Sequence, residues 1–277
     1  MKRSISLLVG ALTRAPLATR VAAGFVGFWL VLAVGGPWVA PHPVGAFVDQ
    51  DVFSGLSARL WLGSDYLGRD VFSRLLYGAR YTVFLGLGAA LLAACCGTAL
   101  ALWATLSGGA IDEVISRLMD TLISIPSKIL ALVLVAACGS SLPLLLLICA
   151  LTYVPGNFRI ARALAMNLAA LDFVAAARAR GERKFAIALH EVLPNMVHPL
   201  LADLGLRFVF VVLLLSGLSF LGLGVQPPYA DLGSLVRENI SGLTEGAPAI
   251  LAPALAIAVL TVGTNLLIDA LKPEDKR

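Results

Sequence analysis

Long apolar segments alternate with short polar ones along almost the whole chain. Five of the apolar segments contain no Asp, Glu, Lys or Arg. Each is longer than the roughly 20 residues that an α-helix needs to cross about 30 Å of hydrocarbon. They are residues 21–48, 81–111, 129–158, 208–230 and 246–268. The pattern therefore predicts an all-α polytopic membrane protein.

The segment 129–158 is too long for one span, and turn residues interrupt it at 139–143. Dividing it predicts one span at about 119–138 and another at about 142–163. Charge supports the division, because residues 157–198 carry six Lys or Arg against three Asp or Glu. Basic segments stay in the cytosol. With the basic N-terminus also inside, two spans place this segment in the cytosol, whereas one span would place it outside.

The predicted organisation is six transmembrane helices with both termini cytoplasmic. The outer loop 41–80 carries four arginines beside four aspartates, which departs modestly from the rule that basic residues stay inside. We expect a cytoplasmic lead-in at 1–20, a transmembrane domain at 21–272 and a cytoplasmic tail at 273–277. The predicted spans are about 21–40, 81–106, 119–138, 142–163, 199–223 and 248–269.

The longest polar interruption between apolar segments is residues 172–195. Asp172 is placed to cap a first short helix, and Gly181 to end it in the left-handed conformation. A second helix follows until Pro194 stops it. Its expected apolar stripe is Phe185, Leu189 and Val192. The layout predicts a slender cytoplasmic pair of helices, between the fourth and fifth spans, that docks into a partner.

Composition agrees with a membrane protein and offers no enzyme chemistry. Of the 277 residues, 59% are apolar and 14% charged, against about 25% charged in an average soluble domain. The net charge is +4, and the basic residues cluster beside the spans, so they are topology signals and not a nucleic-acid patch. No phosphate-binding loop, nucleophile motif or metal-spaced His/Cys set occurs. We therefore expect no catalytic residue, cofactor or bound metal.

A few polar residues lie in or beside the spans. Asp203 and Arg207 stand four apart near the inner end of the fifth span; they either neutralise each other or mark a functional site. Other polar side chains could line a translocation path or simply bond between helices. They are Ser216, Ser219, Thr261 and Asn265.

The charged segment 63–80 has two interpretations. Its acidic and basic side chains could hold an interfacial helix by ion pairs four residues apart. The alternative is contact with a substrate or a partner. The side chains concerned are Asp65, Arg69, Asp70 and Arg74.

The cytoplasmic segment resembles the EAA loop by which permeases of ABC importers contact their ATPases. The matching residues are Ala175, Ala176, Ala177, Gly181, Leu193 and Pro194. The chain departs from the usual loop at Ala175, where Glu is common, and at Glu191, where an apolar residue is common.

Three further segments resemble the dipeptide/oligopeptide/nickel permeases within that class. They are residues 63–80, 120–126 and 219–228, in the same order as in those permeases. Leu232 departs from the family, which commonly has Trp there. The resemblance covers roughly residues 20–272.

This resemblance implies the permease subunit of a bacterial ABC importer, multi-pass in the inner membrane, for peptides, nickel or a related small solute. It further implies a second homologous permease, two ATPase subunits and an extracytoplasmic binding protein as partners, with coupling through the EAA-like loop. The alternative is a self-sufficient secondary transporter or channel, which would call for ionisable residues deep in the spans or for inverted repeats. A membrane-embedded assembly factor is a third possibility.

Overall fold

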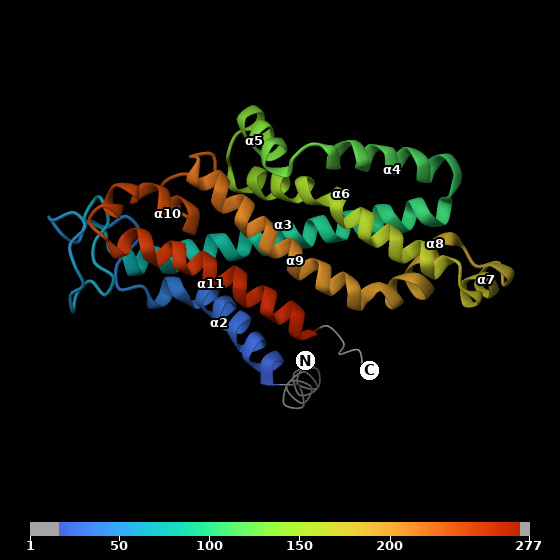
Figure 1. Ribbon diagram of the computed structural model, residues 1–277, viewed down its shortest axis with the longest axis horizontal. Helices are drawn as coiled ribbons and strands as arrows, with labels where there is room; N and C mark the ends of the chain where they lie inside the picture. Colours follow the sequence, from blue (N-terminus) through green and yellow to red (C-terminus); the bar gives the residue numbers. More distant parts are fainter. Residues whose placement is uncertain (1–16, 272–277) are drawn as a thin grey trace. The chain divides into compact units, whose positions relative to one another are not determined.

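The computed structural model describes residues 17–271, and every regular element in that range is helical (Figure 1). Most of each apolar segment, and most of the charged segment between the fourth and fifth spans, is helical. In chain order they are α2 (Leu17–Val39), α3 (Val71–Ser107), α4 (Gly109–Ser124), α5 (Ser127–Cys138), α6 (Leu142–Ala169), α7 (Asp172–Ala179), α8 (Lys184–Ala186), the π-helix η1 (Ile187–Val192), α9 (Leu193–Phe220), α10 (Leu232–Glu238), the 3₁₀-helix η2 (Ile240–Leu243) and α11 (Pro248–Leu271).

Four of these helices are long and apolar enough to cross a membrane: α3, α6, the continuous helix Lys184–Phe220 and α11. A fifth span results if α4 and α5 together count as one. The apolar part of α2, Gly24–Val39, is shorter. The all-α polytopic class is thus confirmed, whereas the number six remains a prediction. Most of the predicted lead-in 1–20 and the whole tail 273–277 lie outside the described residues.

The predicted span 119–138 is not one straight helix. It falls on α4 and α5, which are bent by 91° at the break between them. Pro126 has no amide hydrogen to donate and disfavours a helical conformation in the residue before it. Ile125 is accordingly extended, with φ −85° and ψ 124°. The proline therefore divides an apolar segment that hydropathy alone would run together.

The chain divides into two units. The first combines residues 17–86 with residues 212–271. In it α2 packs along α11, as Figure 1 shows. A Cβ atom at Gly263 would lie only 1.8 Å from the Phe25 ring, so the aromatic ring occupies the space that glycine leaves open. Residues 40–70 form a loop without regular helix, pinned by backbone hydrogen bonds such as Val48 N to Gly68 O at 2.9 Å.

Gly233 at the start of α10 is required by a close backbone approach. A Cβ atom there would lie 2.5 Å from the carbonyl oxygen and 2.6 Å from the Cα of Ser216 on α9. Neither backbone atom can move aside cheaply. We expect Gly233→Ala to destabilise the protein by about 1–3 kcal/mol, because overpacking forces the backbone to shift. Thermal unfolding of the purified protein would measure the loss.

Gly217→Ala is the matched control for this prediction. Gly217 lies on α9, next to Ser216 in the chain, and a Cβ atom there meets nothing within 4 Å. Alanine in an exposed helical position should be neutral or slightly stabilising. Equal unfolding midpoints for the two variants would contradict the packing argument.

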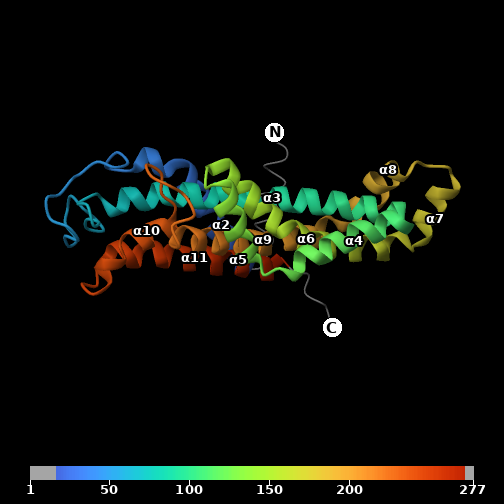
Figure 2. The same ribbon diagram turned by 90° about the horizontal axis from the view of Figure 1, so that it is seen from above.

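The second unit comprises residues 87–211 (Leu87–Val211). It holds the larger part of α3, then α4 to α8 and η1, and the first part of α9. Arg162 of α6 donates to Asp112 of α4 through Nε at 2.7 Å, which ties those two helices together. In Figure 2 the chain reverses direction between α7 and α8 at one end of this unit. The segment singled out in the sequence lies in that reversal.

Candidate functional site

The first helix of the segment 172–195 is α7, and it begins one residue earlier than expected. Asp172 does not cap it: the N-cap is Leu171, without a side-chain hydrogen bond, and Asp172 is the first helical residue. The prediction of an Asp172 cap is therefore wrong. Its carboxylate still lies in the first turn, where negative charge interacts favourably with the helix dipole.

Gly181 has the left-handed conformation that the sequence predicted, with φ +79°. The Gly181 amide donates to the carbonyl oxygen of Arg178 at 3.0 Å, and the Glu182 amide donates to that of Ala177 at 3.2 Å. This pair of bonds is a Schellman motif, which satisfies carbonyl groups left free at the helix end. A Cβ atom at Gly181 would meet nothing within 4 Å. Backbone conformation, and not space, therefore demands glycine here.

Pro194 does not stop the second helix, contrary to the prediction. The helix runs without a break from Lys184 to Phe220. The π-helix η1 precedes the proline, and the amide of Leu193 donates to the carbonyl oxygen of Ala188, five residues back. A π-turn of this kind is a known irregularity within α-helices. It lets the helix pass through the proline region and become α9.

The same π-turn changes which side chains are buried. The predicted stripe is wrong, since Phe185 is 75% exposed and Leu189 is 39% exposed, while Val192 is buried. Ile187 and Ala188 are buried beside Val192. A wide turn shifts the helical phase that the predicted stripe assumed.

Four of the six EAA-like residues are accessible. Ala175, Ala176, Gly181 and Pro194 are exposed, Leu193 is half-buried and Ala177 is buried. Across the reversal, Arg180 Nε donates to Glu182 Oε1 at 2.8 Å, and Arg180 Nη2 lies 3.4 Å from Glu191 Oε1. Glu191, the charged departure from the EAA pattern, thus helps to close the hairpin. We call residues 172–194 the coupling hairpin below, after the EAA-like loop that they resemble.

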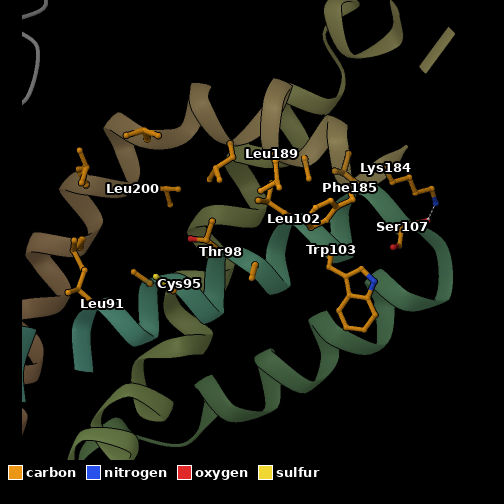
Figure 3. A pocket seen from close by; sticks show the side chains of 18 residues that line it. Leu91, Cys95, Thr98, Leu102, Trp103, Ser107, Lys184, Phe185, Leu189 and Leu200 are labelled. Atoms are coloured by element: carbon orange, nitrogen blue, oxygen red, sulfur yellow. Dashed lines mark hydrogen bonds between the residues drawn. The ribbon is translucent and has the colours of Figure 1, made fainter. Parts of the chain in front are cut away.

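An apolar groove of about 830 Å³ borders the coupling hairpin within the second unit (Figure 3). It lies between α3 and the helix that begins at Lys184, and Figure 3 shows Leu102 and Leu189 facing each other across it. At one end Lys184 Nζ donates to the carbonyl oxygen of Ser107 at 3.3 Å. Sequence reasoning missed the groove because its two walls are distant in the chain and each reads as an ordinary apolar helix face.

A buried polar network joins α3, α6 and α9 in the second unit. The predicted pair is confirmed: Arg207 donates to Asp203 through Nε at 2.9 Å and Nη2 at 3.0 Å. Asn157 Nδ2 donates to Asp203 Oδ2 at 2.7 Å, and Thr98 Oγ1 donates to Asn157 Oδ1 at 3.2 Å. The sequence did not reveal Asn157, because a single amide within an apolar segment carries no periodic signal.

A second buried charge cluster lies in the first unit. Asp65 Oδ2 accepts from Arg69 Nε and from Arg74 Nη1, both at 2.7 Å. Glu238, the last residue of α10, accepts from Arg69 Nη2 at 3.0 Å and from Arg74 Nη1 at 2.8 Å. Burial alone would lower the pKa of Arg69, but the charges of Asp65 and Glu238 outweigh it and raise that pKa. The cluster fastens the loop to α3 and α10.

The predicted interfacial helix at 63–80 is therefore wrong in part. Helix α3 begins only at Val71, and the residues before it form turns. Asp70 does not pair with Arg74 but accepts from the backbone amides of Phe72 at 3.1 Å and Ser73 at 3.2 Å, which caps α3. Of the expected ion pairs four residues apart, Asp65–Arg69 forms, though in a turn.

The four candidate path residues lie in the first unit. Thr261 Oγ1 donates to the carbonyl oxygen of Ile257 at 2.8 Å, within its own helix. Ser219 is buried and accepts from the amide of Val225 at 3.3 Å. Ser216 is also buried, and Asn265 is half-buried. Thr261 and Ser219 thus bond to backbone atoms close to them in the chain.

Comparison with known proteins identifies relatives over nearly the whole chain. Residues 82–274 match the family described as binding-protein-dependent transport system inner membrane component. A dipeptide transport system permease from Alkalihalophilus pseudofirmus is 32% identical, over 88% of this chain and 80% of its own length. A glutathione transport system permease from Pectobacterium atrosepticum is 32% identical over 91% and 84%. A probable D,D-dipeptide transport system permease from Escherichia coli is 32% identical over 96% and 89%.

A solved structure has the same fold. The MetNI methionine ABC transporter, in inward-facing conformations, aligns with a TM-score of 0.56 over 72% of this chain and 96% of its own. Sequence identity is 14%, so this likeness concerns the fold alone.

Proposed function

The chain belongs to the inner-membrane components of binding-protein-dependent transport systems, and from this premise we propose that it carries short peptides and is driven through its coupling hairpin. Membership makes the chain a permease subunit of an ATP-driven ABC importer, located in the bacterial inner membrane as a multi-pass protein. It is a transport subunit and not an enzyme, because separate ATPase subunits hydrolyse ATP in such importers. A substrate-binding protein is a further partner. A self-sufficient transporter or channel does not fit this membership.

We place six spans in the membrane, with both termini in the cytoplasm. In this topology α2 is the first span and the bent pair α4–α5 is the third. The basic residues of 157–198 support the orientation, since it keeps the coupling hairpin in the cytosol. A second, homologous permease and two ATPase subunits complete the complex. Between the two permeases lies the path for the solute, with Ser216, Ser219, Thr261 and Asn265 as candidates to line it.

The coupling hairpin is suited to bind a partner and to transmit its movement to the membrane helices. Its first helix presents the small side chains of Ala175 and Ala176 at the surface, so a partner can approach the backbone closely. Gly181 and the Arg180 ion pairs fix the reversal. Because one helix continues from Lys184 to Phe220, a displacement of the hairpin is transmitted directly to α9. Rigid-body movement of packed helices is a common way to switch between conformational states.

The proposal that the solute is a short peptide rests on the three relatives described above. Each relative is a transport permease for a dipeptide or for glutathione, which is itself a short peptide, and each matches at least 80% of its own length. Short peptides are therefore a better candidate than nickel, which the resemblance of the sequence motifs left equally open.

Uptake by the reconstituted complex tests the proposal. The permease would be purified with its partner subunits and reconstituted in liposomes. ATP would be enclosed in the liposomes with the ATPase subunits, and the binding protein and a radiolabelled dipeptide would be added outside. We expect ATP-dependent accumulation that unlabelled di- and tripeptides reduce and that a tenfold excess of Ni²⁺ leaves unchanged. Uptake that survives ATP depletion would refute the importer mechanism. Accumulation of Ni²⁺ with none of peptide would refute the substrate class.

A further inference from the structure

The buried network of the second unit connects the two legs of the coupling hairpin. Helix α6 leads into the hairpin and carries Asn157, while α9 leads out of it and carries Asp203 and Arg207. The hydrogen bond from Asn157 Nδ2 to Asp203 Oδ2, at 2.7 Å, joins these two legs directly. Thr98 adds α3 to the group through its bond to Asn157. Three helices are thus held at one point, well away from the chain reversal.

Two glycines shape the helices around this point. A Cβ atom at Gly97 of α3 would lie 2.5 Å from Asn157 Oδ1, and one at Gly156 of α6 would lie 2.6 Å from Arg207 Nη1. Any other residue would collide with the polar groups that make the network. The backbone of each neighbouring helix thus approaches closely enough to enclose the charges. Asn157 is fully buried, and Asp203 and Arg207 are only 5% and 7% exposed.

Stability alone is a poor reason for such an arrangement. Burying an ion pair costs desolvation energy, and well-packed apolar residues in its place are often as stable or more so. A buried, hydrogen-bonded polar cluster can instead specify one relative position of the helices, because its hydrogen bonds form only in that position. Asp203 illustrates this, since both its oxygens are engaged by Arg207 and one also by Asn157.

We propose that the Thr98–Asn157–Asp203–Arg207 network is a positioning device that makes both legs of the coupling hairpin move together with α3. A push on the hairpin then displaces the three helices as one body. Without the network, α6 and α9 slide against each other and absorb the movement. Within the network Asn157 is the decisive member, because there it alone joins α6 to α9, whereas the Asp203–Arg207 pair lies within one helix. A further hydrogen bond between these helices, from Tyr153 Oη to the carbonyl oxygen of Phe210 at 3.1 Å, lies outside the network. The inference rests on the proposed role of the hairpin.

Two variants remove the link in different ways. Asn157→Leu removes the network's link between the legs and leaves the ion pair and the Tyr153–Phe210 hydrogen bond in place. The double variant Asp203→Leu/Arg207→Met removes both charges, so that no unpaired charge is buried, although the Asn157 amide loses its acceptor. Thr152→Val is the matched control: Thr152 is a buried residue of α6 whose hydroxyl donates to Ile148 O at 2.7 Å within the same helix.

The experiment measures solute transported per ATP hydrolysed by the complete complex in liposomes. We expect both network variants to assemble and to hydrolyse ATP with the KM for solute unchanged. Solute transported per ATP should fall at least about fivefold. Thr152→Val should retain the wild-type ratio. A wild-type ratio in either network variant would overturn the proposal. If Gly181→Val uncouples transport and the network variants do not, the inference fails and the role of the hairpin stands; if none of them uncouples transport, the hairpin itself is not the coupling element.

Discussion

Replacing Gly181 with valine should abolish most ATP-driven uptake while the protein still reaches the membrane. Gly181 has φ +79°, and a residue with a Cβ atom pays about 1–2 kcal/mol in that conformation, more if it is β-branched. The turn would open to relieve the strain, and the Schellman bonds that fix α7 against α8 would be lost. A loss of this size corresponds to about a tenfold fall in uptake. Uptake and ATP hydrolysis by the reconstituted complex would be measured together.

Two controls separate loss of coupling from general strain. Gly139→Val introduces valine at another glycine of positive φ, +96°, with no atom within 4 Å of its Cβ and no part in the hairpin. Gly181→Asn places at the same position a residue that tolerates the left-handed conformation. We expect near-normal uptake per assembled complex from both. Normal uptake by Gly181→Val would refute the docking account of the hairpin.

Asp65→Asn should be among the most destabilising single substitutions in the chain. Asp65 is 1% exposed and accepts from two arginine side chains and from the amides of Leu67 and Arg69, each at 2.9 Å. Asparagine keeps the shape but removes the negative charge, so Arg69 and Arg74 would share Glu238 alone. Breaking a buried ion pair on one side costs about 3–5 kcal/mol. Unfolding of the purified variant by heat and by denaturant would show the loss.

The exposed pair Glu113–Arg117 provides the comparison. Its nearest atoms are 3.9 Å apart, and both side chains are more than two-thirds exposed, at 71% and 79%. Water and salt screen such a pair, so Glu113→Gln should change stability by less than about 1 kcal/mol. Glu238→Gln should resemble Asp65→Asn, because it removes the other negative charge of the same cluster. Equal stability of Asp65→Asn and Glu113→Gln would contradict the role given to the buried cluster.

Hydropathy and backbone rules predicted the parts of this structure that depend on local chemistry. Charge-free segments became the long helices α3, α6, α9 and α11, because an apolar segment of that length has few other stable states in a membrane. Gly181 was predictable since few other residues adopt positive φ at a helix end. The Asp203–Arg207 pair was predictable because residues four apart share a helix face.

Features that depend on distant residues were not predictable in this way. Asn157 meets Asp203 across 46 positions of sequence, and Glu238 meets Arg74 across 164. The local sequence around Asp203 or Arg74 does not predict either partner. The prediction that Pro194 ends the second helix was wrong for a different reason. The rule that proline ends a helix assumes α-helical hydrogen bonding, and η1 replaces that bonding with a wider turn just before the proline.

The π-turn Ile187–Val192 contains one residue more than the corresponding α-helical turn would hold. If the same residues wound as an ordinary α-helix, with none removed, the extra residue would pass into the regular turns. Every side chain on its N-terminal side would then turn by about 100° about the helix axis, the angle between neighbouring residues of an α-helix. Phe185 and Lys184 would leave their present directions, while Asp203 and Arg207 would keep theirs. The π-turn therefore sets the orientation of the side chains in the coupling hairpin relative to those of α9.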